Sequence, residues 1–240
     1  MRILRYLILM VLSLPAWSQG SGQNFPLLSF EISSHQLSSA FSAFIYFEGG
    51  EKHLKRVQQA VASSEQRFEA LPDKPVGLQT AWSAAKAHVK RYESHVFNGV
   101  DMSLEGGWSL ALNKLQSEIE ALKAAQPVEA EHKQSMQYQT LSFNLSLENL
   151  LSQYMSIANS TTGGYGVSRG DLSIEDRVAM TETLLMALKK SGQNVDAVNR
   201  KWQYIKKTIL AYNSNIAPFV VIHTIETIRK KSAQLLAVEG

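Results

Sequence analysis

The chain of 240 residues contains no cysteine, only six prolines and no stretch in which apolar and polar residues alternate. Without cysteine the protein has no disulfide, no thiol nucleophile and no thiolate ligand for zinc or an iron–sulfur cluster. Because an amphipathic strand alternates with period two, the missing alternation predicts that the fold has no sheet. Hydrophobic residues make up 45% of the chain, which excludes an intrinsically disordered protein.

A long apolar run is missing after residue 18, and the run before it is short. Residues 1–18 have the three parts of a secretory signal, which are a positive start, an apolar centre and a small-x-small end: Arg2 and Arg5, residues 7–14, and Ala16-Trp17-Ser18. This order predicts a signal peptide that is cleaved between Ser18 and Gln19. An uncleaved anchor is the alternative, but the run falls short of the ~20 residues that span a bilayer.

Excess charge of one sign is also scarce. The full chain has a formal net charge of +3, and the loss of Arg2 and Arg5 with the signal leaves +1 on the remaining 222 residues. A nearly neutral protein lacks the basic footprint of a nucleic-acid-binding protein, so no nucleic-acid partner is expected. After removal of the signal, no stable membrane anchor is expected either. A short signal followed by a chain without cysteine predicts a periplasmic location in a bacterium. Secretion beyond the cell is the alternative.

Apolar residues recur three and four positions apart from residue 25 onward, which is the spacing of one face of an α-helix. The clearest stripe is Leu78, Trp82, Ala85, Val89, Tyr92 and Val96. Comparable stripes, separated by helix-breaking residues, predict an all-α fold of about eight amphipathic helices. Pro26 and Pro218 are placed to begin helices, Asn98-Gly99 to end the third, and Ser173 with Asp176 to form a capping box. Short connections favour antiparallel neighbours.

The two halves of the sequence resemble each other at an offset of 120 residues. Five pairs are identical within residues 82–100: Trp82 and Trp202, Lys86 and Lys206, Tyr92 and Tyr212, Ser94 and Ser214, Val100 and Val220. We interpret this as an internal duplication that gives two tandem antiparallel four-helix units, residues 24–126 and 138–237, joined by a polar linker at 127–137. A single longer bundle, or amphipathic helices that share only their spacing, are the alternatives.

Candidate binding residues lie in two places. Lys86 and Lys206 occupy equivalent positions beside the apolar stripes, where they could bind an anionic ligand or extend along the bundle edge as solvated side chains. Residues 161–171 form the longest turn-rich stretch, and its Tyr165, Arg169 and Asp171 could contact a partner. The tryptophans and tyrosines of the stripes are expected in the core.

No arrangement of residues predicts an enzyme or a cofactor. Residues 166–170 spell Gly-x-Ser-x-Gly around Ser168, but a nucleophile elbow needs a strand before the serine. His88 and His95 lie two helical turns apart, ~10 Å, which is too far to share one zinc ion. Glu129 and His132 form a single Glu-x-x-His, whereas a di-iron bundle needs two. A haem between one histidine and one methionine is a remote alternative.

The sequence therefore predicts an exported, non-catalytic helical protein with a binding or accessory role. It would present helical faces, or a cleft between its two units, to a small ligand or an envelope partner. The alternative is a structural or adaptor protein that docks other helices and has no small-molecule pocket. An enzyme is the least favoured class.

Overall fold

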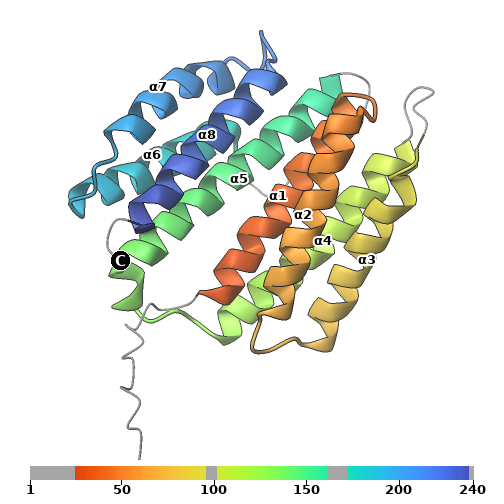
Figure 1. Cartoon of the computed structure of the whole chain (residues 1–240), viewed down its shortest axis with the longest axis horizontal. Helices are drawn as coiled ribbons and strands as arrows, with labels where there is room; N and C mark the ends of the chain where they lie inside the picture. Colours follow the sequence, from red (N-terminus) through yellow and green to blue (C-terminus); the bar gives the residue numbers. More distant parts are fainter. Residues whose placement is uncertain (1–24, 96–101, 162–171, 238–240) are drawn as a thin grey trace, which may run out of the picture.

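The computed structural model describes residues 25–95, 102–161 and 172–237, and within these ranges the protein has eight α-helices, one short 3-10 helix and no strand (Figure 1). The α-helices are α1 (Pro26–Tyr46), α2 (Glu51–Glu69), α3 (Val76–Tyr92), α4 (Met102–Ala125), α5 (Met136–Thr161), α6 (Ile174–Lys190), α7 (Asp196–Leu210) and α8 (Pro218–Ala237). The prediction of an all-α fold with about eight helices is confirmed for the described residues.

Most helix ends follow the local sequence signals. Pro26 begins α1 and Pro218 begins α8. At the start of α6, the backbone N–H of Asp176 donates to Ser173 Oγ at 3.0 Å, and the Asp176 carboxylate accepts from the backbone N–H of Ser173. The expected end of the third helix at Asn98-Gly99 is wrong. The helix ends at Tyr92, because the N–H of His95 turns back to the carbonyl of Tyr92 in a tight turn.

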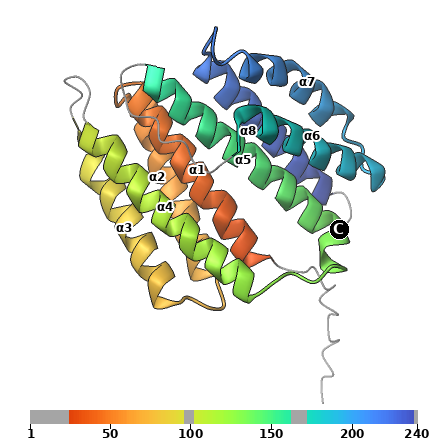
Figure 2. The ribbon, with the colours of Figure 1, turned by 180° about the vertical axis from the view of Figure 1, so that it is seen from behind.

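Helices α1 and α5 lie side by side at the centre of the molecule, with α3 and α4 at one edge and α6 and α7 at the other (Figures 1 and 2). Helix α1 packs against α2 and α4, and α5 packs in the same way against α6 and α8. The segment expected as a polar linker contains the 3-10 helix His132–Gln134, and α5 already begins at Met136. The two four-helix groups thus form one body joined along α1 and α5.

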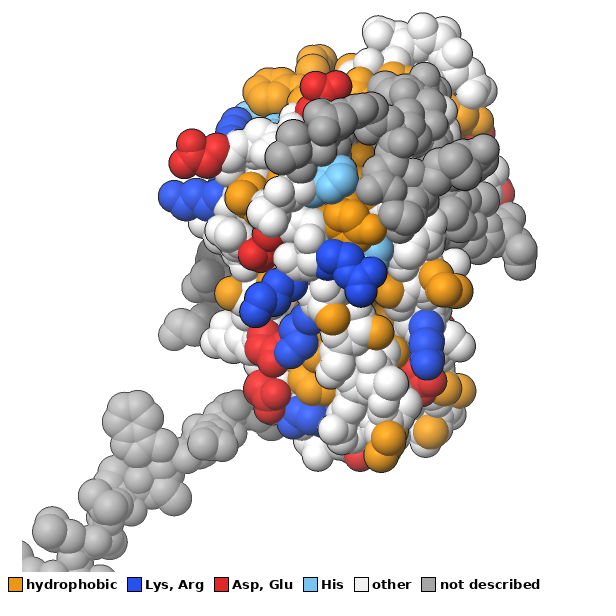
Figure 3. All heavy atoms as spheres, turned by 90° about the vertical axis from the view of Figure 1, so that its right-hand side faces the viewer, with side chains coloured by type: hydrophobic (Ala, Val, Ile, Leu, Met, Phe, Trp, Pro, Cys, Tyr) orange, Lys and Arg blue, Asp and Glu red, His pale blue; other side chains and the backbone are white. Residues whose placement is uncertain are grey.

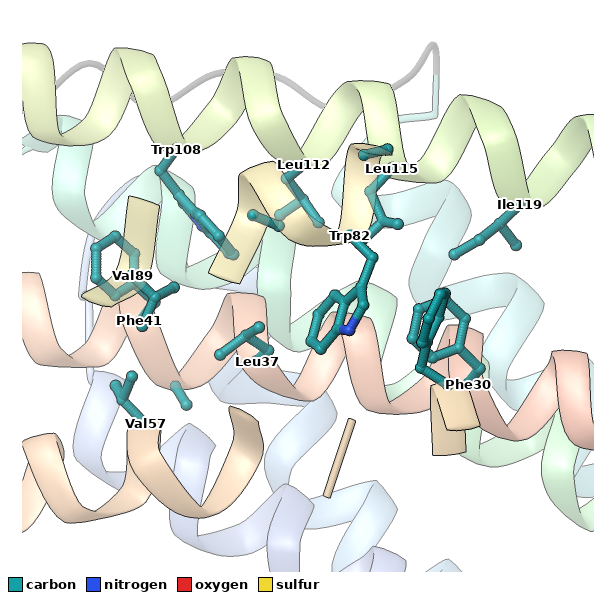
Figure 4. Close-up of a cluster of buried hydrophobic side chains, with 14 of the residues drawn as sticks. Phe30, Leu37, Phe41, Val57, Trp82, Val89, Trp108, Leu112, Leu115 and Ile119 are labelled. Atoms are coloured by element: carbon teal, nitrogen blue, oxygen red, sulfur yellow. The ribbon is translucent and has the colours of Figure 1, made fainter. Parts of the chain in front are cut away.

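Each four-helix group encloses its own apolar core. In the first, Trp82 and Trp108 lie among leucine and phenylalanine side chains from α1, α3 and α4 (Figure 4). In the second, Trp202 is fully buried among side chains of α5, α6, α7 and α8. Burial of one large apolar side chain contributes roughly 1.5–3 kcal/mol, so these stripes account for the packing of each group.

The two groups bury side chains in matching register. Helix α2 buries Val57, Ser64 and Phe68, and α6 buries Ile174, Thr181 and Leu185. Each corresponding pair is 117 positions apart, whereas Trp82 and Trp202 are 120 apart. The chain between the second and third stripes is therefore three residues longer in the second half. The tandem duplication itself stays a prediction.

The contact between α1 and α5 is polar, which the sequence stripes did not indicate. Ser38 Oγ lies 2.8 Å from Ser152 Oγ, and the side-chain amide of Asn159 donates to the carbonyl of Ser42 at 3.2 Å. Every residue of α1 from Phe30 to Phe44 is buried except Gln36. Helix α1 therefore has no solvent-exposed face along this stretch, because small serine side chains allow α5 to approach it closely.

Candidate functional site

The two lysines that the sequence singled out each form an ion pair between helices. Lys86 Nζ on α3 lies 2.7 Å from Glu65 Oε1 on α2, and Lys206 Nζ on α7 lies 2.9 and 2.8 Å from the two carboxylate oxygens of Glu182 on α6. Hydrogen bonds from Lys206 and then Gln203 hold the pKa of Glu182 below its usual value. An anionic ligand at either lysine would have to displace a carboxylate, and the two lysines lie in separate halves.

The core residues Trp82 and Trp202 differ in whether their indole N–H groups have a hydrogen-bond partner. Trp82 Nε1 donates to Glu65 Oε2 at 2.6 Å, so Glu65 binds both Trp82 and Lys86. Trp202 Nε1 is buried and has no hydrogen-bond partner among the described residues. The expectation that both tryptophans belong to the core is confirmed.

The remaining predicted positions lie outside the described residues. They are the loop residues Tyr165, Arg169 and Asp171, the serine Ser168, and the cleavage pair Ser18 and Gln19. The structure places none of them.

A cavity of about 440 Å³ lies at the lower end of the molecule in Figure 1, where α1 begins and α4 ends. Four segments form it: the first turns of α1, the connection from α2 to α3, the last turn of α4, and the chain after α4 as far as the first turn of α5. Its apolar lining consists of Phe25, Pro26, Leu27, Leu28, Leu71, Pro72, Leu122, Pro127, Val128 and Tyr138. A volume within roughly 300–1,000 Å³ and a mostly apolar wall are typical of small-molecule sites.

The polar groups of this cavity centre on Glu31 and Lys123. Lys123 Nζ donates to Glu31 Oε1 at 3.1 Å and to Glu120 Oε1 at 2.8 Å. The second carboxyl oxygen of Glu31, Oε2, is buried and has no hydrogen-bond partner among the described residues. Asp73 and Lys133 complete the charged part of the wall. A buried acceptor without a donor is uncommon in folded proteins, and water, a proton shared with the neighbouring Glu120 carboxyl, or a ligand can satisfy it.

Burial is the main influence on the charge of Glu31. It raises the pKa of this carboxyl above its usual value, while Lys123 opposes the rise and Glu120 adds to it. Burial also works against the charged form of Lys123, but the neighbouring carboxylates outweigh it and raise the pKa of Lys123. The pair therefore places a buried carboxyl group and its cationic partner at the wall of an apolar cavity.

The sequence contains one signal for this site that the spacing of apolar residues does not reveal. Glu31 is the only Asp, Glu, Lys or Arg in the 21 residues of α1. A single carboxylate in a helix otherwise free of such charge points to a specific contact, because a carboxylate without one would not be buried.

The fold defines the structural class of the protein. Within the described ranges it is all-helical, with two four-helix groups joined along α1 and α5. No protein family, curated protein or solved structure matches the chain. None of the described helices combines the length and apolar character that a membrane span needs. In the part of the chain that the structure describes, no group of three or more His, Asp or Glu is placed to hold a metal ion. The functional interpretation therefore depends on the cavity.

Proposed function

We propose that this protein is an exported, non-catalytic binding protein that takes up a small amphipathic molecule in the cavity at Glu31. The observation that carries the proposal is that Glu31, which lines an apolar cavity of about 440 Å³, has a buried carboxyl oxygen, Oε2, without a donor among the described residues. The ligand would have an apolar body and one hydrogen-bond donor, such as a hydroxyl, an amide N–H or an ammonium group. The export signal in residues 1–18 supports a periplasmic place of action.

The ligand's two parts would be recognised by different residues. Leu28, Leu71 and Leu122 would cover the apolar body, and Glu31 would accept from the donor. A hydrogen bond to a charged group contributes about 1.5–3 kcal/mol, which corresponds to roughly a tenfold to hundredfold difference in affinity. The donor would therefore decide which apolar molecules bind tightly.

The adaptor interpretation has less support from the surface. On the face that Figure 3 shows, basic, acidic and apolar side chains are interspersed. The most exposed large apolar side chains, Val76 on α3 and Leu110 on α4, are separated from each other along the two helices. Docking surfaces for helices are usually broad apolar patches.

A fluorescence titration with N-phenyl-1-naphthylamine tests the proposal, because this probe has an apolar body and one N–H donor. Val128→Trp places a large side chain into the cavity from the segment before α5, and we expect it to weaken binding by about tenfold or more. Val76→Trp is the matched control, because Val76 is 78% exposed and lies outside the cavity lining. Undetectable binding by the unaltered protein, or equal binding by the Val128→Trp protein, would contradict the proposal.

A further inference from the structure

A second cavity of about 290 Å³ lies between the two halves, at the upper end of the molecule in Figure 1, where α2 and α8 begin. One wall consists of Phe47, just after α1, and of Lys52, His53, Lys55, Arg56 and Gln59 on α2. The other wall consists of Phe219, Ile222, His223 and Glu226 on α8. Because α1 runs between the two ends of the molecule, this cleft lies far from the cavity at Glu31.

One ion pair in the lining of the cleft joins the halves, and a second lies beside it within the second half. Arg56 on α2 contacts Glu226 on α8, with 2.7 Å between guanidinium nitrogen and carboxylate oxygen. One turn further along α8, Arg229 donates to Glu148 of α5 at 2.5 Å. Arg56 is thereby fixed by its partner, while Lys52 and Lys55 are exposed at the mouth. Three cationic side chains and one carboxylate line the cleft, so its electrostatic potential favours an anion.

Aromatic rings face the same cleft from both halves. Phe47 stacks on His53 with 4.3 Å between ring centroids and 11° between planes, and Phe219 lies nearly parallel to His223 at 6.4 Å and 6°. Phe219 is 60% exposed, and Lys52 Nζ lies 5.5 Å from the centroid of its ring. His53 Nδ1 is buried and has no hydrogen-bond partner among the described residues. Flat apolar surface and positive charge therefore coincide.

We propose that this cleft binds a small aromatic anion, whose ring stacks on Phe219 and whose acidic group is bound by Lys52 and Lys55. Stacking on an exposed ring and ion pairing with two flexible ammonium groups are both available without displacing the Arg56–Glu226 pair. This site goes beyond the cavity at Glu31, which selects an apolar molecule with a donor and offers an acidic acceptor. The two sites differ in charge and would take different ligands.

Isothermal titration calorimetry of the full chain with naphthalene-2-sulfonate tests this site. Two related compounds separate the contributions: methyl 2-naphthyl sulfone has the ring without the charge and carries no donor for the cavity at Glu31, and methanesulfonate has the charge without the ring. We expect the aromatic sulfonate to bind at least about tenfold more tightly than either, the difference expected for one charge-assisted hydrogen bond or one stacked ring. Failure of the sulfonate to bind at millimolar concentration, or equal binding by the neutral sulfone, would overturn the proposal.

Four protein variants then locate the binding. Lys52→Gln with Lys55→Gln removes two exposed charges from the mouth, and Phe219→Ala removes the exposed ring; each is expected to weaken binding of the sulfonate about tenfold. Lys201→Gln with Lys207→Gln on α7 makes the same change in net charge at exposed positions outside the cleft and should leave binding unchanged. Val128→Trp, which fills the other cavity, should also leave it unchanged.

The outcomes are distinguishable from those for the cavity at Glu31. Equal binding of the sulfonate by the Lys52/Lys55 variant and by the unaltered protein would overturn the site, and so would loss of binding in the Val128→Trp variant. Circular dichroism checks that each variant remains helical. The exchanged side chains are exposed except that of Val128, which is half-buried.

Discussion

Lys123 Nζ lies 3.1 Å from one carboxyl oxygen of Glu31, while the other oxygen of the same carboxyl is buried without a partner among the described residues. The pair connects α4 to α1 at the wall of the larger cavity. This half-satisfied carboxyl is the feature on which both the stability of this end of the molecule and the proposed ligand binding depend.

Removal of Lys123 is expected to destabilise the protein. Lys123→Met leaves the Glu31 carboxyl buried without its cation, and breaking a fully buried pair destabilises by about 3–5 kcal/mol. Because the Lys123 side chain is 37% exposed, we expect a smaller loss of about 1–3 kcal/mol. Urea unfolding measures it, with Lys114→Met, an exposed lysine of the same helix, as control. Equal effects of the two substitutions would contradict the structural role of Lys123.

The stability of the protein should depend on pH through Glu31. Burial raises its pKa in the folded state, so the folded protein takes up a proton more readily than the unfolded chain. The free energy of unfolding should therefore rise, relative to that of a Glu31→Gln variant, as the pH falls from neutral towards the unfolded value near 4.5. Urea titrations of both proteins at several pH values from 8 to 5 measure the difference. A difference that stays constant, or changes in the opposite direction, would contradict the raised pKa.

Glu65 and Glu182 allow a matched comparison between the halves. Both accept from a lysine of the following helix, but Glu65 also accepts from the buried N–H of Trp82. Glu65→Ala leaves this indole donor unsatisfied, so we expect it to destabilise by about 1–3 kcal/mol. Glu182→Ala removes a partly exposed ion pair and an exposed hydrogen bond from Gln203, which together contribute about 0–1 kcal/mol because both are accessible to solvent. Chemical unfolding monitored by tryptophan fluorescence measures both losses of stability. A larger loss in Glu182→Ala than in Glu65→Ala would contradict the prediction.

The close contact of α1 and α5 should not tolerate a larger side chain. Ser38→Leu inserts apolar volume where Ser38 Oγ lies 2.8 Å from Ser152 Oγ, and overpacking of this kind destabilises by about 1–3 kcal/mol. Ser83→Leu on α3 is the control, because Ser83 is exposed. If thermal unfolding shifts equally in the two variants, the halves are not packed as described.

Export can be tested independently of the folded structure. Expression of the full chain in a bacterial host should give a periplasmic protein whose first residue is Gln19, because the predicted cleavage follows Ser18. Intact-mass measurement of the periplasmic fraction identifies the new terminus. A protein that remains in the cytoplasm with residues 1–18 attached would contradict the predicted signal.

Most of the core could be predicted from the sequence, because large apolar residues at helical spacing carry a strong signal. Trp82 and Trp202 are buried as the stripes require, and the capping pair of Ser173 and Asp176 forms as its spacing indicates. Helix composition and short-range spacing are local properties, so they need no knowledge of distant segments.

The centre of the molecule and the cavity could not be predicted in this way. Ser38 and Ser152 are 114 positions apart, and serine has no apolar signal that would indicate burial. The cavity at Glu31 is assembled from four segments between Phe25 and Tyr138, so it exists only once the helices have packed. The ion pairs of Lys86 and Lys206 also depend on partners on another helix, which the sequence offered no means to choose.

The most direct test of the central claim compares N-phenyl-1-naphthylamine with 1-benzylnaphthalene, in which a methylene group replaces the N–H. Titration with the fluorescent amine, and displacement of the amine by 1-benzylnaphthalene, give the affinity of each compound for the unaltered protein and for Glu31→Leu. We predict that the unaltered protein prefers the amine by about tenfold or more and that the preference disappears in Glu31→Leu, because the donor then has no acceptor. The same preference in both proteins would show that Glu31 does not recognise the ligand.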